Sequence, residues 1–288
     1  MRLNYLSKME GKSTSRIAVF TIDVEEWYHL EYFKNSETDK ERSVMDGLRK
    51  FIQIINKHDI KATFFIVGEL IQSLQTTIRD LDRDGHDIGL HSYGHRRPVE
   101  QDLEEFISDT KRTVSEMRSI LPTNSFGYRS PCFALDRVRL DEVVNLGLKY
   151  DASKITQKEH PLYVNLDLKG FEEQEKDIYV KDSFKVYEVS TIKFLGVNIP
   201  IAGGGYLRII PWPLYLWLLK RYLKESTFIN FFIHPFELSD ASFDLPENTP
   251  YLTKFRYNYK RNQVEKRLNL IIELLKAEGY IFKTFSQI

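Results

Sequence analysis

The stretch "IAVFTIDVEEW", from Ile17 to Trp27, decides how this chain folds. Its first six residues are apolar or β-branched, which is typical of a buried strand, and three acids follow within the next four positions. Side chains on a strand alternate between its two faces, so Asp23 and Glu25 are expected to point the same way. The stretch therefore predicts a core strand with two carboxylates at its carboxyl end. Taken alone, these acids fit a surface cluster equally well.

Apolar runs of the same kind recur along the chain, and helical patterns separate them. With 288 residues and 42% hydrophobic composition, the chain can bury the core of one large α/β domain or of two small ones. The alternation predicts parallel strands covered by helices, arranged as a barrel or as a doubly wound sheet. The expected strands are 17–23, 61–67, 86–91 and 227–234, and the expected helices are 44–55, 103–117, 136–146 and 264–275.

Composition excludes several classes of protein. The 41 basic residues balance the 41 acidic ones, so no nucleic-acid partner is expected. Cys132 is the single cysteine, which rules out an internal disulfide and a Cys-rich zinc motif. Residues 1–16 form an extension without the apolar centre of a secretory signal, so a cytoplasmic location is expected. The apolar stretch 209–223 holds two prolines and is too short for a membrane span; it predicts a buried helix, with a membrane-surface helix as the alternative.

The segment "HSYGH" carries two histidines, His91 and His95, four residues apart. Two imidazoles at this spacing can reach one divalent ion if the segment turns as a helix, and a carboxylate would complete a three-ligand site. Most segments of this pattern bind no metal, so two incidental loop histidines are the alternative. The position directly after a predicted strand favours the metal site. His86, at the beginning of that strand, is expected to be structural.

Three later segments also hold candidates for chemistry. Arg129 in "GYRSP" is a cation on a stiff loop, suited to pairing with a carboxylate. His234 in "FFIHPFEL" directly follows an apolar strand, which suits a general acid, and Glu237 is a candidate to orient it. The glycines 203–205 predict either a sharp turn or a loop that approaches a substrate. Because catalytic groups of parallel barrels gather at the carboxyl ends of the strands, Asp23 is expected to meet Arg129 and His234 there.

In their order and spacing from about Phe20 to Glu237, these segments resemble the polysaccharide deacetylase family (NodB homology, carbohydrate esterase 4-like). The nearest branch has a first motif like "DVEDWF", a "GGGY-R" segment and an "HP-E" ending. The resemblance implies a distorted (β/α)7 barrel, a single α/β domain over residues 17–288 with a polar insertion at about 155–185. It also implies metal-dependent removal of an N-acetyl group from an acetylated amino sugar.

The resemblance also implies roles for individual residues. Asp23 matches the general base, Arg129 the arginine that orients it, and His234 the general acid. His91 and His95 match the metal-binding histidines. For the third ligand, many members have a second aspartate at the position that Val24 occupies here; Glu25 is the expected replacement, with Glu26 and Asp23 as alternatives.

The expected ligands and partners follow from these roles. We expect one divalent ion, zinc in the first place, with cobalt, nickel or iron able to bind the same residues. The partner is a carbohydrate, which Tyr206 and Arg208 would hold, while the backbone N–H of Trp27 or Tyr28 would stabilise the oxyanion. The alternatives are a hydrolase of another C–N bond, in a cyclic amide or ureide, and a carbohydrate-binding homologue without catalysis.

Overall fold

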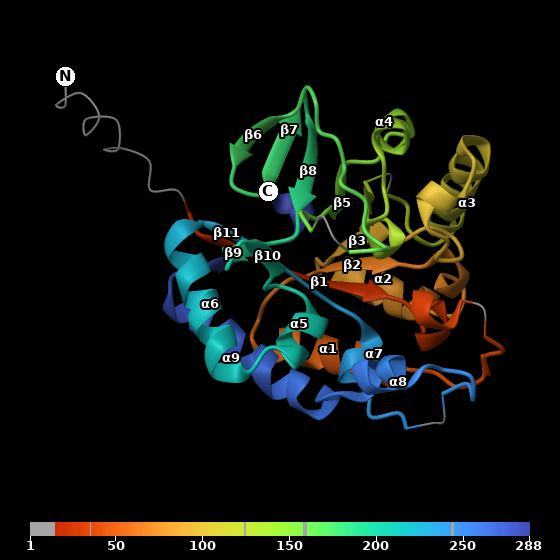
Figure 1. The fold of residues 1–288 in the computed structure, drawn as a ribbon. Coiled ribbons are helices and arrows are strands. Elements are labelled where there is room, and N and C mark those ends of the chain that lie inside the picture. The colour runs from red at the N-terminus through yellow and green to blue at the C-terminus, as the bar shows by residue number, and fades with distance from the viewer. Residues whose placement is uncertain (1–14, 35, 124, 158–159, 243–244) are drawn as a thin grey trace, which may run out of the picture.

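The computed structural model describes residues 15–34, 36–123, 125–157, 160–242 and 245–288, which form one curled sheet with helices around it (Figure 1). Within these ranges, seven strands run parallel and side by side. In spatial order they are β11 (Phe228–Ile233), β1 (Ile17–Val24), β2 (Thr63–Ile66), β3 (Asp87–Leu90), β4 (Gly127–Tyr128), β5 (Tyr150–Lys154) and β8 (Phe184–Glu188). The central strands are buried on both faces, which explains their nearly continuous apolar sequence.

The barrel is open between β8 and β11, and side chains bridge the gap. The Asn230 amide donates to the carbonyl of Glu188 at 2.7 Å, and the Asn230 backbone N–H donates to Ser190 Oγ at 3.1 Å. On the far side of β8, the antiparallel strands β7 (Ile178–Lys181) and β6 (Glu172–Glu175) extend the sheet. The predicted fold, a distorted barrel of seven parallel strands in one domain, is confirmed.

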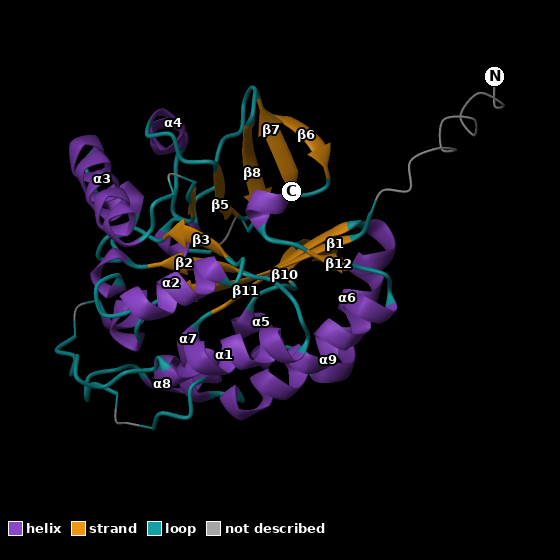
Figure 2. Cartoon of the chain, turned by 180° about the vertical axis from the view of Figure 1, so that it is seen from behind, coloured by secondary structure: helices purple, strands orange, loops and turns teal. Residues whose placement is uncertain are grey.

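Helices cover the outside of the sheet (Figure 2). Their buried residues recur at three- and four-residue spacing, as Phe51 and Ile55 do in α1 and as Leu268 and Ile272 do in α9. Burying each such side chain contributes about 1.5–3 kcal/mol. The helices are α1 (Asp46–Lys57), α2 (Gln75–Arg83), α3 (Leu103–Ile120), α4 (Arg137–Asn145), α5 (Gly204–Ile209), α6 (Trp212–Glu225), α7 (Pro235–Leu238), α8 (Tyr251–Asn258) and α9 (Val264–Ala277).

Two segments singled out in the sequence take distinct forms. The apolar stretch 209–223 forms the end of α5 and most of α6, which buries Tyr215 and Tyr222 against the core and leaves Trp217 half exposed. In the described part of the chain, no helix is long and apolar enough to span a bilayer. The polar stretch 155–185 divides into a loop and the β6–β7 hairpin, and β8 begins within its end. Of the predicted N-terminal extension, residues 1–14 lie outside the described residues.

A short hairpin, β9 (Thr191–Phe194) and β10 (Val197–Pro200), follows β8, and β12 (Ile281–Phe282) pairs with the start of β1. The chain then passes from β10 through the three glycines into α5. The predicted strands and helices agree with the structure to within a few residues at their ends.

Candidate active site

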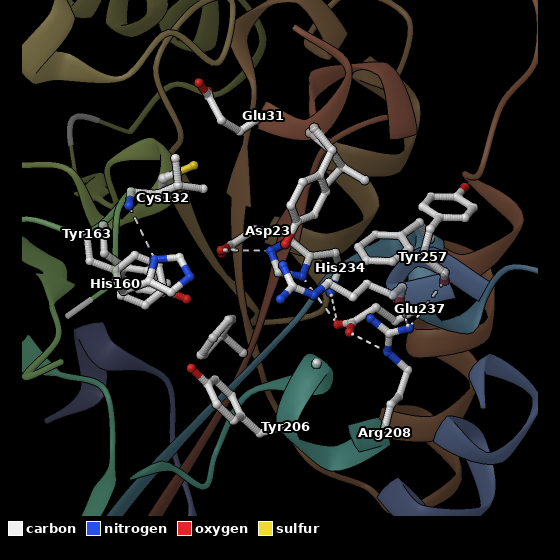
Figure 3. A pocket seen from close by; sticks show the side chains of 18 of the residues that line it. Asp23, Glu31, Cys132, His160, Tyr163, Tyr206, Arg208, His234, Glu237 and Tyr257 are labelled. Carbon is white, nitrogen blue, oxygen red and sulfur yellow. Dashed lines mark hydrogen bonds and ion pairs between the residues drawn. The ribbon is translucent and has the colours of Figure 1, made fainter. Parts of the chain in front are cut away.

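The carboxyl ends of four parallel strands bring the predicted polar residues together. Asp23 lies near the end of β1, and His91, Arg129 and His234 directly follow β3, β4 and β11. Asp23 and His91 are 2% exposed and Arg129 is fully buried, so these polar groups sit inside the barrel mouth. Figure 3 shows Asp23 and His234 facing each other across the pocket floor. Parallel strands end at the same rim, which is why residues so distant in sequence meet.

Glu25, His91 and His95 converge as a possible metal site. Their ligand atoms all lie within 4.8 Å of one another. Glu25 Oε2 is 2.5 Å from His95 Nε2 and 3.9 Å from His91 Nε2, yet it makes no hydrogen bond within the described residues. A buried carboxylate oxygen without a hydrogen bond is costly unless a cation satisfies it. This donor set therefore fits a divalent ion.

His91 is held in the form that a metal requires. Its Nδ1 donates to the carbonyl of Arg129 at 2.8 Å, which leaves the lone pair of Nε2 directed at Glu25. Burial lowers the pKa of His91 to about 4, so the ring is neutral at pH 7. Burial opposes ionisation of Glu25, but the histidines around it, first His95 and then His234 and His91, outweigh burial and lower the pKa of Glu25 to about 2.

The segment that joins the two histidines is a loop and not the helical turn that was the condition for the two rings to reach one ion. Ser92 and His95 have left-handed backbones, with φ of 57° and 55°. The Gly68 N–H donates to the carbonyl of Ser92 at 2.9 Å, and the Glu69 N–H donates to that of Tyr93 at 2.9 Å. These bonds fix the loop against the turn that follows β2. The loop brings the two imidazole rings to 5.0 Å between centroids, a proximity that a helical turn was expected to provide.

Arg129 fixes the orientation of Asp23. Its Nη1 donates to Asp23 Oδ1 at 2.7 Å and to Thr21 Oγ1 at 2.7 Å, and its Nε donates to the carbonyl of Ala152 at 3.2 Å. The guanidinium also lies over the Phe65 ring, 4.2 Å from its centroid. The other oxygen of Asp23, Oδ2, faces His234 Nε2 at 3.9 Å. One carboxylate oxygen is therefore anchored and the other faces the pocket.

His234 is supported from behind by Glu237. Glu237 Oε2 lies 3.2 Å from His234 Nδ1 and accepts the His234 backbone N–H at 3.1 Å, and Arg208 Nε donates to Glu237 Oε1 at 3.1 Å. On the other side of the ring, Nε2 is 3.8 Å from Glu25 Oε1. Burial disfavours the charged ring, but Glu237, Glu25 and Asp23 outweigh it and raise the pKa of His234 to about 9. For Glu237, burial is outweighed by His234 and Arg208, which lower its pKa.

A pocket of about 340 Å³ lies over this polar floor. Aromatic side chains form much of its wall: Tyr32, Phe133, Tyr163, Tyr206, Phe232, Phe236 and Tyr257. Cys132 also lines the pocket, where burial raises the pKa of its thiol, so the thiol stays protonated and is no nucleophile. The size and the mixture of apolar wall and polar floor are typical of small-molecule sites.

Three predicted substrate residues have different positions. Tyr206 lines the pocket, and its hydroxyl donates to Gln157 Oε1 at 2.8 Å. Arg208 also lines it, but its guanidinium binds Glu237 and the carbonyls of residues 256, 257 and 259. Trp27 is 2% exposed, and neither it nor Tyr28 lines the pocket. A short 3-10 turn directs the Trp27 ring into an apolar cluster with Phe33. The role of the Trp27 or Tyr28 backbone N–H toward an oxyanion stays a prediction.

Other lining residues were missed in the sequence. Tyr32 follows the first motif on a short 3-10 turn, and His160 and Tyr163 stack on each other at 3.7 Å between ring centroids. Arg256 reaches the pocket from α8. These residues lie on loops or on a short helix, where neither strand nor helix periodicity marks them. The one available signal was the polar stretch at 155–185, which contains His160 and Tyr163.

Known protein families match the two halves of the chain separately. Residues 41–150 match the family model described as Polysaccharide deacetylase, and residues 161–287 match the model described as Domain of unknown function (DUF3473). A peptidoglycan deacetylase of Helicobacter pylori is 22% identical over 120 residues, which are 42% of this chain and 41% of that protein. A chitin deacetylase of Pestalotiopsis sp is 23% identical over 134 residues, 46% of this chain and 41% of that protein.

Solved structures share the fold. A CE4 family pseudoenzyme from Bacillus anthracis has a TM-score of 0.55 and 12% identity, with 96% of this chain and 66% of that chain covered. A peptidoglycan N-acetylglucosamine deacetylase has a TM-score of 0.52 and 14% identity, with 96% and 89% covered. The chain spans half or less of the length of the curated relatives it matches. Residues 41–150 are therefore similar to the polysaccharide deacetylase family, in agreement with the resemblance that the motifs indicated.

Proposed function

We propose that the chain is a metal-dependent hydrolase that removes the N-acetyl group from an acetylated amino sugar, in a polysaccharide or in a sugar-linked precursor. The observation that carries this proposal is the convergence of three buried ligands, Glu25, His91 and His95, beside an anchored carboxylate and a supported histidine. The matching relatives are named as deacetylases of peptidoglycan and chitin, which supports the same reaction class.

Glu25, His91 and His95 would hold the ion. Two imidazoles and one carboxylate suit zinc, and cobalt, nickel or iron bind the same set. When bound, a divalent ion supplies polarisation of the amide carbonyl and acidification of a water molecule. The unsatisfied Glu25 Oε2 and the free lone pair of His91 Nε2 are the features of this chain that fit such an ion.

Asp23 and His234 then divide the proton transfers. Asp23 Oδ2, which Arg129 leaves free, accepts the proton of the attacking water. His234 Nε2 donates a proton to the sugar nitrogen as the C–N bond breaks, because an amine leaves poorly without one. Glu237 holds the other ring nitrogen, so that Nε2 keeps its direction into the pocket. The anchoring contacts of both residues exist before a substrate arrives, which reduces the reorganisation needed for reaction.

Two other functions compete with this one. A hydrolase of a cyclic amide or ureide would use the same acid and base on a different C–N bond. A carbohydrate-binding homologue without catalysis is the second, and one solved structure of similar fold is described as a pseudoenzyme. Against simple binding stands the complete set of acid, base, their two supporting residues and three ligands in one pocket.

The test is acetate release from N-acetylglucosamine oligosaccharides by protein loaded with zinc or cobalt, with and without a chelator. We expect release that the chelator abolishes. His234→Ala should lower kcat by about 10²–10⁴-fold while the metal content stays near one ion per chain. Loss of the metal in this variant would contradict the acid role. Tight sugar binding by metal-loaded wild type without acetate release would favour the binding protein, and turnover of a cyclic amide alone would favour the other hydrolase.

A further inference from the structure

Arg256 is the cation of the pocket wall that has no carboxylate partner among the described residues. The three carboxylates that line the pocket are each paired: Asp23 with Arg129, Glu237 with Arg208, and Glu31 with Lys34. Arg208, the predicted substrate-binding cation, is occupied by Glu237 and by backbone carbonyls. Arg256 therefore remains as the charge that a ligand can meet.

Arg256 lines the pocket together with Tyr32 and His160. Its positive charge acts on both residues. Burial raises the pKa of Tyr32 and Arg256 lowers it, whereas burial and Arg256 both lower the pKa of His160. The residue is exposed, so its guanidinium is open to a ligand. Its backbone carbonyl accepts from Arg208 Nη1 at 2.8 Å, which ties this turn of α8 to the support of Glu237.

We propose that Arg256 binds an anionic group, a carboxylate or a phosphate, that the substrate carries next to its acetylated amino sugar. The inference rests on the proposed function and adds a substrate class to it. A guanidinium presents paired N–H donors that match either anion in a two-point contact. The sugar ring would lie between the aromatic side chains of the pocket. Tyr163 and Tyr206, on the wall opposite Glu237, are the candidates to contact it (Figure 3).

The test compares three acetylated substrates on metal-loaded protein: a neutral chitin tetrasaccharide, an oligosaccharide of N-acetylglucosamine and a uronic acid, and uridine diphosphate N-acetylglucosamine. Arg256→Gln should lower kcat/KM at least tenfold on the carboxylate or the phosphate substrate, and less than twofold on the neutral one. Arg256→Lys should fall between these values on the anionic substrate. Lys254→Gln is the matched control, because Lys254 lies on the same helix and does not line the pocket.

The outcomes separate this inference from the proposed function. An equal loss on neutral and anionic substrates, or no loss on any, would overturn the anion site and leave the deacetylase standing. If wild type releases acetate from none of the three, calorimetric titration with the same anionic sugars decides. Binding that weakens at least tenfold in Arg256→Gln but not in Lys254→Gln would keep the anion site while the hydrolase fails. Equal binding by both variants would reject both.

Discussion

The two sides of the pocket are built differently. On the side of the candidate metal ligands Glu25, His91 and His95, called the metal side below, each side chain from a strand end has a fixed contact: Asp23 with Arg129, His91 with a backbone carbonyl, His234 with Glu237. Asp23 and His91 are buried and His234 is half-buried. The opposite wall comes from loops and short helices, and it is aromatic and partly exposed, with Tyr32 at 45%. Rigid strands hold reacting groups to the tolerances that catalysis needs, whereas loops can change to fit different substrates. The metal side should therefore decide whether a reaction occurs, and the wall which sugar enters.

The largest effect should come from exchanging the neighbouring acids of the metal side. Glu25→Gln should no longer bind the ion, and its kcat/KM should fall at least about 10³-fold. The reason is that the ion contributes several kcal/mol of transition-state stabilisation. Glu26→Gln is the matched control. Its carboxylate accepts the Val44 N–H at 2.9 Å and contacts Ser43 Oγ, so its loss should cost stability of about 1 kcal/mol and leave the metal in place.

Metal content by mass spectrometry and acetate release check this pair. A metal-free Glu26→Gln beside a metal-loaded Glu25→Gln would move the third ligand to Glu26. It would also show that strand alternation, which places Glu25 on the same face as Asp23, does not determine which acid is the third ligand.

The second largest effect concerns the contact between the glycine segment 203–205 and Glu237, which supports His234. Gly204 in α5 touches Glu237, and a Cβ at this position would overlap Glu237 Oε2. Gly204→Ala should therefore push Glu237 away from His234 and Arg208, with a loss of stability of about 1–3 kcal/mol. Gly205→Ala is the control, since a Cβ there meets no atom within 4 Å. On the same helix it should gain about 0.5–1 kcal/mol from helix propensity.

Thermal unfolding of the two variants shows directly whether each substitution raises or lowers the stability. Opposite signs would show that the glycine segment serves a close approach to the acid's support. Destabilisation of equal size in both would mean that the segment serves backbone freedom instead, even though the described glycines 203–205 have no positive φ.

The sequence predicts the strand-built side better than the wall. Asp23, His91 and His234 could be found because an expected apolar strand ends at each, and a strand end has a known place in a barrel. Arg129 could be found as a cation on a stiff loop beside a proline. Nothing comparable marks Arg256 or Tyr32, whose places depend on how loops cross the barrel mouth. Arg208 was identified as a cation near the site, but its partners come from 29 residues and more along the chain. Long-range pairing of this kind leaves no local signal.

The loop between the histidines is instructive in the same way. Spacing alone indicated that His91 and His95 could share an ion, and their rings do lie together. They do so without the helical turn that the spacing argument required, because Ser92 and His95 take left-handed backbone conformations. The cytoplasmic location and the identity of the metal stay predictions.

The smallest effect concerns the part of the interior that lies away from the pocket. It tests whether neutral hydrogen bonds, rather than charge pairs, stabilise that part. Asp177, in the β6–β7 turn, accepts from the Tyr222 hydroxyl at 2.6 Å, and burial raises its pKa from 3.8 to about 7. The folded chain thus holds this proton more tightly than the unfolded chain. The resulting stabilisation is complete below about pH 4 and is lost as the pH rises through 7, a few kcal/mol at most.

Asp177→Asn mimics the protonated acid and suits the left-handed backbone at this position, where φ is 69°. Between pH 5 and 8, its melting temperature should fall less steeply than that of wild type. Asp182→Asn is the control, because Asp182 is an exposed acid with a left-handed backbone in the next turn, and its profile should follow wild type. An Asp177→Asn profile parallel to wild type would mean that Asp177 is ionised in the folded chain, so that the contact between Asp177 and Tyr222 would depend on charge, as the contacts of the metal side do.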